Sequence, residues 1–185
     1  ASDECYAQLA WEEPWVSQGV PSLLDPRVNG GDLTSLLALY SLSKRSSAAG
    51  YRMAWIAGDP KIIKPLLEIR KHMGMMVPGP VQAAMVAAVA DESHVAEQVE
   101  RYSQRRTKLL AALAEAGYVV DNSQAGLYLW LRAQDGADAW TMIERLANVG
   151  ILAAPGTFYG DQSHVRLSLT ATDAAIEDAV LRLTE

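Results

Sequence analysis

The sequence has little of several residue types on which small secreted folds and metal sites depend. Its single cysteine, Cys5, excludes a disulfide within the chain and agrees with a reducing cytoplasm. It has three histidines and no CxxC or HExxH pattern, so we expect no structural metal. No apolar run reaches the roughly 18 residues that a transmembrane helix needs, and no signal-peptide pattern is visible. The sequence therefore predicts a cytoplasmic protein that has no membrane partner.

What the chain does have is the composition of a globular protein. Half of its 185 residues are hydrophobic and 21% are charged, and this length allows one ordinary domain or two small ones. The net charge of −6 argues against nucleic acid as a partner. The basic residues of segment 101–108 have the spacing of a solvated helix face. The chain opens at Ala1 without a methionine and motif-like residues follow at once, so we expect it to lack the N-terminal part of a larger protein.

The first half alternates between polar segments and short apolar runs. Brief apolar runs suggest buried strands, and clusters of Pro, Gly, Asp and Asn suggest loops. Asp59-Pro60 is a good helix start, because aspartate caps free N–H groups and proline suits the first helical position. In order, the pattern predicts a short helix at 5–11, a loop at 12–35, strands at 36–42 and 53–57, and helices at 59–72 and 81–90.

The second half begins with a long amphipathic helix over about residues 91–116, which Gly117 ends. We expect this helix to connect two lobes. An α+β lobe of about 80 residues should follow it. Its predicted strands and helices are strands at 118–120, 127–131, 151–154 and 165–169 and helices at 137–149 and 172–184. The sequence therefore predicts an α/β chain with two domains, 1–95 and 96–185.

Lys44 is the first residue that suggests chemistry. It follows an apolar strand and lies among hydroxyl and small side chains, in the segment SLSKRSSAAGYR. A lysine can form an imine with an aldehyde cofactor, and partial burial beside the cations Arg45 and Arg52 favours the neutral amine that this requires. Serine hydroxyls and an arginine fork suit a phosphate group. The alternative is a basic surface turn with Gly50 as its hinge.

The spacing of this segment adds a resemblance. SxxK followed by GxR, with Arg52 eight residues after Lys44, resembles the cofactor-lysine motif of the aspartate aminotransferase superfamily. The resemblance implies that Lys44 binds pyridoxal 5'-phosphate (PLP) as an imine and that Ser41 and Arg52 hold the phosphate. SxxK also occurs in penicillin-binding enzymes, but their companion motifs SDN and KTG do not accompany it here.

A second motif lies at the start of the chain, where Asp3-Glu4-Cys5-Tyr6 forms a DExY sequence. An acidic pair before a helix is ordinarily a cap. The segment also resembles the D-x-x-Y motif of the same superfamily, at the right distance upstream of Lys44. The resemblance implies that Asp3 pairs with the pyridine nitrogen of the cofactor and that Tyr6 hydrogen-bonds its phenolic oxygen.

A third motif surrounds Arg166 in the segment HVRLSL. An arginine on a strand is ordinarily an ion-paired surface residue. The resemblance implies instead that Arg166 binds the α-carboxylate of the substrate, for which a planar fork is well suited. The segments AAPGTFYG (153–160) and AGLYLW (125–130) resemble two further family segments, with the alternative that they only shape the lobe. His164 lies close to Arg166 and is the histidine of most interest.

Taken over the whole chain, the resemblance implies the C-terminal half of a fold type I PLP-dependent aminotransferase. The first domain would be the remainder of the large α/β/α domain, and the second the small α+β domain. The most similar subfamily is succinyldiaminopimelate aminotransferase of bacterial lysine and cell-wall biosynthesis, with 2-oxoglutarate as acceptor and a homodimer with shared active sites. Another aminotransferase, a carbon–sulfur lyase on the same fold, or a non-catalytic aminotransferase-like sensor domain remain alternatives.

Overall fold

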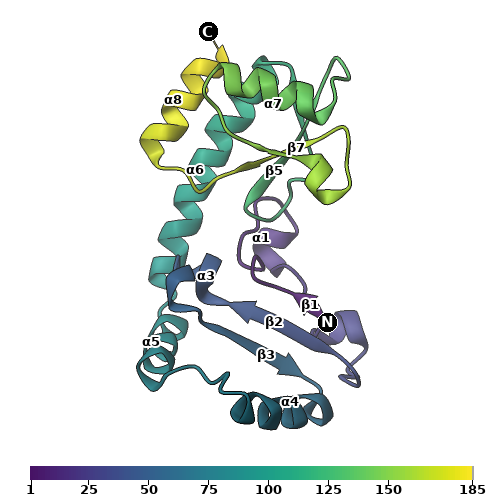
Figure 1. The fold of residues 1–185 in the computed structure, drawn as a ribbon, viewed down its shortest axis with the longest axis vertical. Coiled ribbons are helices and arrows are strands. Elements are labelled where there is room, and N and C mark those ends of the chain that lie inside the picture. Colours follow the sequence, from purple (N-terminus) through teal and green to yellow (C-terminus); the bar gives the residue numbers. More distant parts are fainter. Residues whose placement is uncertain (185) are drawn as a thin grey trace. The chain divides into compact units, whose positions relative to one another are not determined.

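The computed structural model describes residues 1–184, which form two compact units. The boundary between them follows Glu97, within helix α6 (Ser93–Glu115). Each unit combines helices with a sheet of its own, so the α/β class expected from the sequence is confirmed (Figure 1). Within these residues, no helix combines the length and the apolar character that crossing a membrane requires.

The first unit is organised by a three-stranded sheet in the order β1-β2-β3. Its strands are β1 (Ser2–Asp3), β2 (Leu37–Ser41) and β3 (Ala54–Gly58). β1 runs parallel to β2, and β2 runs antiparallel to β3. The strands expected at 36–42 and 53–57 are therefore confirmed. Because parallel strands end at the same edge of a sheet, the residues that follow β1 and β2 emerge at one edge.

The helices of the first unit connect and flank these strands. They are α1 (Trp15–Gln18), α2 (Pro26–Asn29), α3 (Leu42–Arg45), the 3-10 turn η1 (Ala49–Tyr51), α4 (Pro60–His72) and α5 (Gly79–Ala90). Asp59 caps α4 as expected, because its carboxylate accepts the N–H of Lys61 at 2.8 Å. Its second oxygen accepts the N–H of Ser35 at 2.9 Å, which joins the start of α4 to the chain before β2.

The helix expected at residues 5–11 is wrong. The N–H groups of Ala7 and Leu9 donate to carbonyl groups three residues earlier, those of Glu4 and Tyr6, at 3.1 and 2.9 Å. Such bonds make successive turns, whereas an α-helix bonds residues four apart. The loop expected at 12–35 contains the two short helices α1 and α2, each of four residues.

The second unit has an antiparallel sheet in the order β4-β5-β7-β6. Its strands are β4 (Tyr118–Asp121), β5 (Tyr128–Ala133), β6 (Ala154–Pro155) and β7 (Val165–Ser168). The strand expected at 151–154 is shorter and later, since Ile151 still takes part in the turn that follows the preceding helix. Its N–H donates to the carbonyl of Leu146 at 2.8 Å.

One face of this sheet forms the core of the second unit together with helices. These are the C-terminal part of α6, α7 (Ala139–Asn148) and α8 (Asp173–Thr184), and the 3-10 turn η2 (Gly156–Tyr159) follows β6 (Figure 1). The fully buried side chains include Leu109, Leu113, Leu129, Leu131, Met142, Leu146 and Val165. Each contributes roughly 1.5–3 kcal/mol by leaving water. The other face of the sheet is left for polar and aromatic side chains.

Candidate functional site

The carboxyl ends of β1 and β2 place two of the expected motifs at one sheet edge. Asp3 lies opposite Leu39 in the parallel pair, and the N–H of Glu4 donates to the Leu39 carbonyl at 2.8 Å. The chain then turns through Cys5, while β2 continues into α3, which carries Lys44. Cys5 lies within electrostatic reach of both Asp3 and Lys44. In α/β proteins such an edge is where ligands bind.

The charges in this turn are well defined. The N–H of Cys5 donates to the Asp3 carboxylate at 3.1 Å, and hydrogen bonds from Cys5 lower the pKa of Asp3. Burial, followed by the hydrogen bond to Asp3, raises the pKa of the Cys5 thiol to about 11, although the charge of Lys44 acts in the opposite direction. At neutral pH the site therefore offers an ionised carboxylate at Asp3 and a protonated thiol at Cys5. Tyr6 lies half-buried in the same turn.

Ser41 begins the segment that carries Lys44. Its side chain caps α3 by accepting the N–H of Ser43 at 3.1 Å. Its hydroxyl is buried and lies 2.9 Å from the carbonyl of Met53 and 2.8 Å from the hydroxyl of Ser43. Lys44 follows in the same short helix and is half-buried. No hydrogen bond or ion pair joins its amine to any of residues 1–184, so the amine is available to a ligand.

The residues directly after Lys44 are fixed to the junction of α5 and α6. The buried guanidinium of Arg45 donates to the carbonyl of Ala88 at 2.8 Å and forms an ion pair with Glu92. The Ser46 hydroxyl lies 2.9 Å from Nε2 of His94. Sequence reasoning treated Arg45 only as a cation near Lys44. It missed this anchor, because the partners lie more than 40 residues away and no local pattern links them.

Arg52 has a conformation typical of a tight turn. It ends η1 in the left-handed region with φ 54°, and its guanidinium donates to the carbonyl of Ala49 at 2.9 Å. The remaining N–H groups of this exposed side chain make no hydrogen bond within the part of the chain that the structure describes. Arg52 also lines an apolar groove of about 460 Å³ beside β2, β3 and α4. Leu39, which lies opposite Asp3, also lines that groove, whereas Lys44 and Asp3 do not.

In the second unit, Arg166 lies on the face of the sheet opposite the core. It is aligned with Trp130 of β5 in the antiparallel pair of β5 and β7. Its guanidinium lies 4.2 Å from the ring centroid of Tyr128 and 4.8 Å from that of Tyr159. Among the described residues it has no acidic partner and no hydrogen bond. A guanidinium held by aromatic faces keeps its in-plane N–H donors for a carboxylate.

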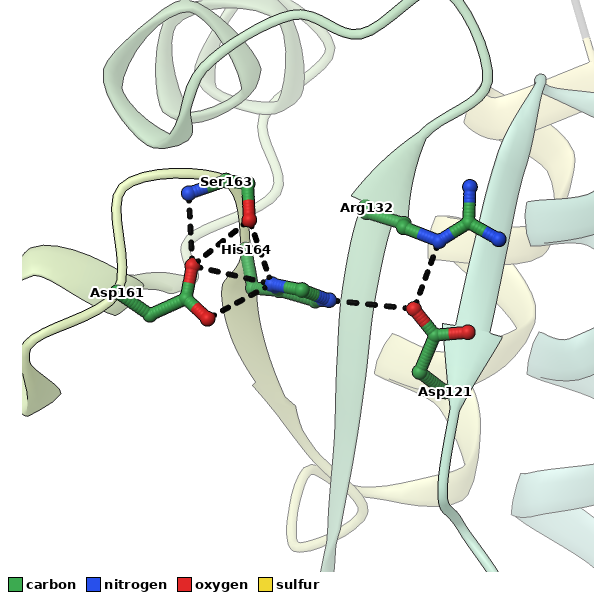
Figure 2. A network of polar contacts seen from close by, with 5 residues as sticks. All are labelled: Asp121, Arg132, Asp161, Ser163 and His164. Carbon is green, nitrogen blue, oxygen red and sulfur yellow. Dashed lines mark hydrogen bonds and ion pairs between the residues drawn. The ribbon is translucent and has the colours of Figure 1, made fainter.

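His164 lies two residues before Arg166, in a polar network that Figure 2 shows. Its Nδ1 is 3.0 Å from the carboxylate of Asp161, and its Nε2 is 3.2 Å from Asp121. Arg132 donates to the same oxygen of Asp121 at 2.7 Å. The hydrogen bond with His164 lowers the pKa of Asp121, and the pKa of Asp161 falls to about 2, chiefly through the N–H of Ser163 and then through His164.

The expected site residues thus fall on both units. The first unit carries Asp3, Tyr6, Ser41, Lys44 and Arg52, and the second carries Arg166. Their chemistry fits the groups of PLP: a free amine for the aldehyde, an ionised carboxylate for the pyridine nitrogen, and a guanidinium for the phosphate. Sequence reasoning also missed the aromatic partners of Arg166, whose only local sign was the alternation of Tyr128 and Trp130 along one strand.

Comparison with known proteins gives one consistent result. The family model described as aminotransferase class I and II matches residues 1–183. The probable aminotransferase Rv1178 of Mycobacterium tuberculosis is 54% identical over 185 residues, which cover 99% of this chain and 43% of that protein. The 4-dedimethylamino-4-oxo-anhydrotetracycline transaminase OxyQ of Streptomyces rimosus is 49% identical, with coverage of 99% and 50%. The chain therefore spans about half the length of the curated relatives it matches.

More distant relatives agree. An LL-diaminopimelate aminotransferase of Dehalococcoides mccartyi is 29% identical over 151 residues, which cover 80% of this chain and 39% of that protein. Among solved structures, an aminotransferase from Staphylococcus aureus superposes with a TM-score of 0.83 at 27% identity. That match covers 98% of this chain and 47% of the other. The coverage agrees with the C-terminal half that the sequence predicted.

Proposed function

Because the chain belongs to the family of class I and II aminotransferases, we propose that the protein carrying it is a PLP-dependent aminotransferase. Members of this family use pyridoxal 5'-phosphate. The observation that carries the proposal is the amine of Lys44, which has no partner among residues 1–184 and lies where the parallel strands β1 and β2 end. Such an amine can bind an aldehyde cofactor covalently.

Each expected residue has a role in this proposal. Lys44 holds the cofactor, and Asp3, which is ionised at neutral pH, pairs with the pyridine nitrogen. Tyr6 hydrogen-bonds the phenolic oxygen. Arg52 binds the phosphate with the N–H groups that it does not use on Ala49. Ser41 also binds the phosphate, and its hydroxyl gives up one of its hydrogen bonds within the chain to do so.

The chemistry follows from these groups. When bound, PLP supplies an electron sink for negative charge on the substrate α-carbon. Lys44 would act as a general base only after the incoming substrate amine had replaced it on the cofactor; as the released neutral amine it would take the proton from that carbon. In the second unit, Arg166 binds the α-carboxylate in its planar fork and so fixes which face of the α-carbon meets the base.

The same proposal assigns a place to each part of the chain. Residues 1–95 are the C-terminal part of the large PLP-binding domain, and residues 96–185 are the small domain. The enzyme acts as a homodimer with shared active sites on an amino acid and a 2-oxo acid. The single cysteine of the chain agrees with a cytoplasmic enzyme.

For the substrate, our first candidate is N-succinyl-diaminopimelate, with 2-oxoglutarate as amino acceptor in lysine and cell-wall biosynthesis. The segments SKRSSAAGYR, RKHMGMMVPGPVQAAM and GLYLW support it by their resemblance to that subfamily. The LL-diaminopimelate aminotransferases among the relatives give further support, at 29% identity in the case described above.

A second candidate is amination of a ketone on an anhydrotetracycline skeleton. OxyQ, whose name states such a substrate, is 49% identical along nearly all of this chain, well above the identity to the LL-diaminopimelate enzymes. Both candidates share the same cofactor chemistry and differ in the compound that exchanges its amino or keto group with the glutamate and 2-oxoglutarate pair.

The test is an assay of the whole protein with PLP and glutamate as amino donor. The two acceptors are the 6-oxo counterpart of N-succinyl-diaminopimelate and the 4-oxo-anhydrotetracycline, and 2-oxoglutarate formation is measured. We expect turnover with one acceptor, its loss in Lys44→Ala, and normal turnover in Lys64→Ala, which changes an exposed lysine of α4. Pyruvate release from a sulfur-containing amino acid would indicate a lyase instead. A cofactor-loaded protein that turns over none of these compounds would contradict the proposal and favour a sensor domain.

A further inference from the structure

The position of Arg166 is set by aromatic rings, and these rings have a support of their own. Tyr159 lies 4.8 Å from the guanidinium, and its ring meets that of Trp130 edge-on at 5.9 Å. Trp130 is also the residue aligned with Arg166 across β5 and β7. A displacement of the indole would therefore shift the guanidinium, both through Tyr159 and through the neighbouring strand.

The indole of Trp130 in turn stacks on the ring of His164. Their centroids are 5.3 Å apart and their planes differ by 12°, so the two rings lie almost parallel. The His164 side chain is only 15% exposed. An aromatic pair of this kind contributes about 0.5–1.5 kcal/mol beyond the area it buries, and it fixes ring orientation.

His164 itself is held at both ring nitrogens. Asp161 lies at Nδ1 and Asp121 at Nε2, at 3.0 and 3.2 Å, and Arg132 donates to the same oxygen of Asp121 that His164 contacts (Figure 2). These partners come from different elements: Asp121 ends β4, Arg132 lies on β5, and Asp161 lies in the loop before β7. A ring bonded at both ends cannot rotate without breaking a charge-assisted hydrogen bond.

We propose that His164 is a positioning residue for Arg166, which it orients through the rings of Trp130 and Tyr159. The inference rests on the proposed function, in which Arg166 binds the substrate carboxylate. The Asp161–His164–Asp121 line clamps the imidazole, the imidazole fixes the indole, and the indole with Tyr159 fixes the guanidinium plane. His164 touches neither substrate nor cofactor in this arrangement, so its effect is on recognition of the carboxylate.

The test compares an α-amino acid donor with the matching amine that lacks the carboxylate. In the whole protein, we expect His164→Leu to lower kcat/KM for the amino acid by about 10- to 100-fold, since a small misplacement of a binding group has effects of this size. The kcat/KM for the amine should not change, because the amine does not use Arg166. In an Arg166→Ala background, His164→Leu should have no further effect on the ratio of the two values. His72→Leu, at an exposed position of α4, is the matched control.

Binding of 2-oxoglutarate, measured by calorimetry, does not depend on turnover. It therefore tests the role of His164 even if the proposed function fails. If the wild type turns over no amino acid, the proposed function fails, and the affinities for 2-oxoglutarate still decide the role of His164. We expect weaker binding by His164→Leu than by the wild type. Equal affinities, an equal fall for the amino acid and the amine, or no binding by the wild type would each overturn the inference.

Discussion

Trp130 and Arg166 lie directly opposite each other on the antiparallel strands β5 and β7. Side chains at opposed positions share one face of a sheet, and Tyr128, two residues before Trp130, shares it too. The neighbouring positions Leu129 and Leu167 point to the buried face. This alternation leaves Arg166 on the face that the core does not fill, held by aromatic rings and without an acid among the described residues.

The planar guanidinium of Arg166 is therefore expected to be required for binding the carboxylate, and a positive charge alone should not replace it. Arg166→Lys keeps the charge but removes the planar arrangement of donors. We expect kcat/KM for an α-amino acid donor to fall by roughly 10- to 100-fold, which corresponds to the loss of about one charged hydrogen bond. The control is Arg145→Lys, which changes an arginine paired with Asp135 on the surface. Equal kinetics for the two variants would contradict the role of Arg166.

Gly156 is expected to tolerate no side chain. Its N–H donates to the carbonyl of His164 at 2.7 Å, and its carbonyl accepts the N–H of Asp161 at 3.0 Å. An added Cβ would lie 2.8 Å from the Asp161 carbonyl oxygen and closer still to that of His164. Gly156→Ala must therefore move the loop that carries His164, and we expect it to cost about 3 kcal/mol in unfolding free energy.

Gly160→Ala is the matched control for this change. Unlike Gly156, Gly160 has a left-handed backbone, with φ 83°, and an added Cβ there meets nothing within 4 Å. We expect a loss of about 1 kcal/mol from backbone strain and no loss of amino acid recognition. Denaturant unfolding measures the first quantity and kcat/KM the second. Normal recognition in Gly156→Ala would show that the loop does not hold His164 in place.

Removing Glu92 and removing Arg45 are expected to have unequal effects on stability. The Arg45 side chain is 4% exposed, whereas that of Glu92 is 70% exposed. Glu92→Ala leaves a buried cation without its counter-charge, and we expect a loss of roughly 1–3 kcal/mol in unfolding free energy. Arg45→Met removes the charge and fills most of the space, so its loss should be smaller. Denaturant midpoints that rank the two variants the other way would show that packing of Arg45, and not its charge, dominates.

The carboxylate of Asp161 should make stability depend on pH. Its pKa lies at about 2, below the ordinary value of 3.8, because the Ser163 N–H and then His164 bind the ionised form. A depressed folded-state pKa contributes stability that is present above about pH 4 and is lost as the pH falls toward 2. Asp161→Asn should therefore be less stable than the wild type at pH 5, and the difference should shrink toward pH 2.

Urea midpoints measured across this pH range test the prediction. Glu144→Gln is the control, because Glu144 is exposed and makes no hydrogen bond or ion pair with the residues that the structure describes. A difference between Asp161→Asn and the wild type that stays constant from pH 5 to pH 2 would show that the network contributes no charge-dependent stability.

Much of the fold could be predicted because its signals are local. Apolar runs marked β2 and β3, and Asp59-Pro60 marked the start of α4. The errors arose where the backbone hydrogen-bond pattern decides whether a segment is a helix, a turn or a strand. Residues 5–11 have a helical composition, but the bonds of Ala7 and Leu9 close turns there, and Ile151 lies in the turn after α7 instead of starting a strand. Composition does not determine whether an N–H bonds the third, fourth or fifth residue back.

The site shows a similar division. Motif spacing singled out Lys44, Asp3 and Arg166, because each lies in a short segment with a recognisable motif. The supports of these residues could not be predicted. Arg45 reaches Glu92 across 47 positions, and His164 reaches Asp121 across 43. Such contacts depend on how strands and helices pack, and a single sequence does not encode them in any local pattern.

The central claim is that Lys44 carries the cofactor, and chemical mapping tests it most directly. The whole protein is incubated with PLP, reduced with borohydride to fix any imine, digested and examined by mass spectrometry, beside Lys44→Ala and the control Lys64→Ala. We predict reduced cofactor on the peptide that contains Lys44, in the wild type and in Lys64→Ala, and a loss of activity of about 100-fold or more in Lys44→Ala. Cofactor fixed at another lysine, or none fixed in a folded wild type, would contradict the account.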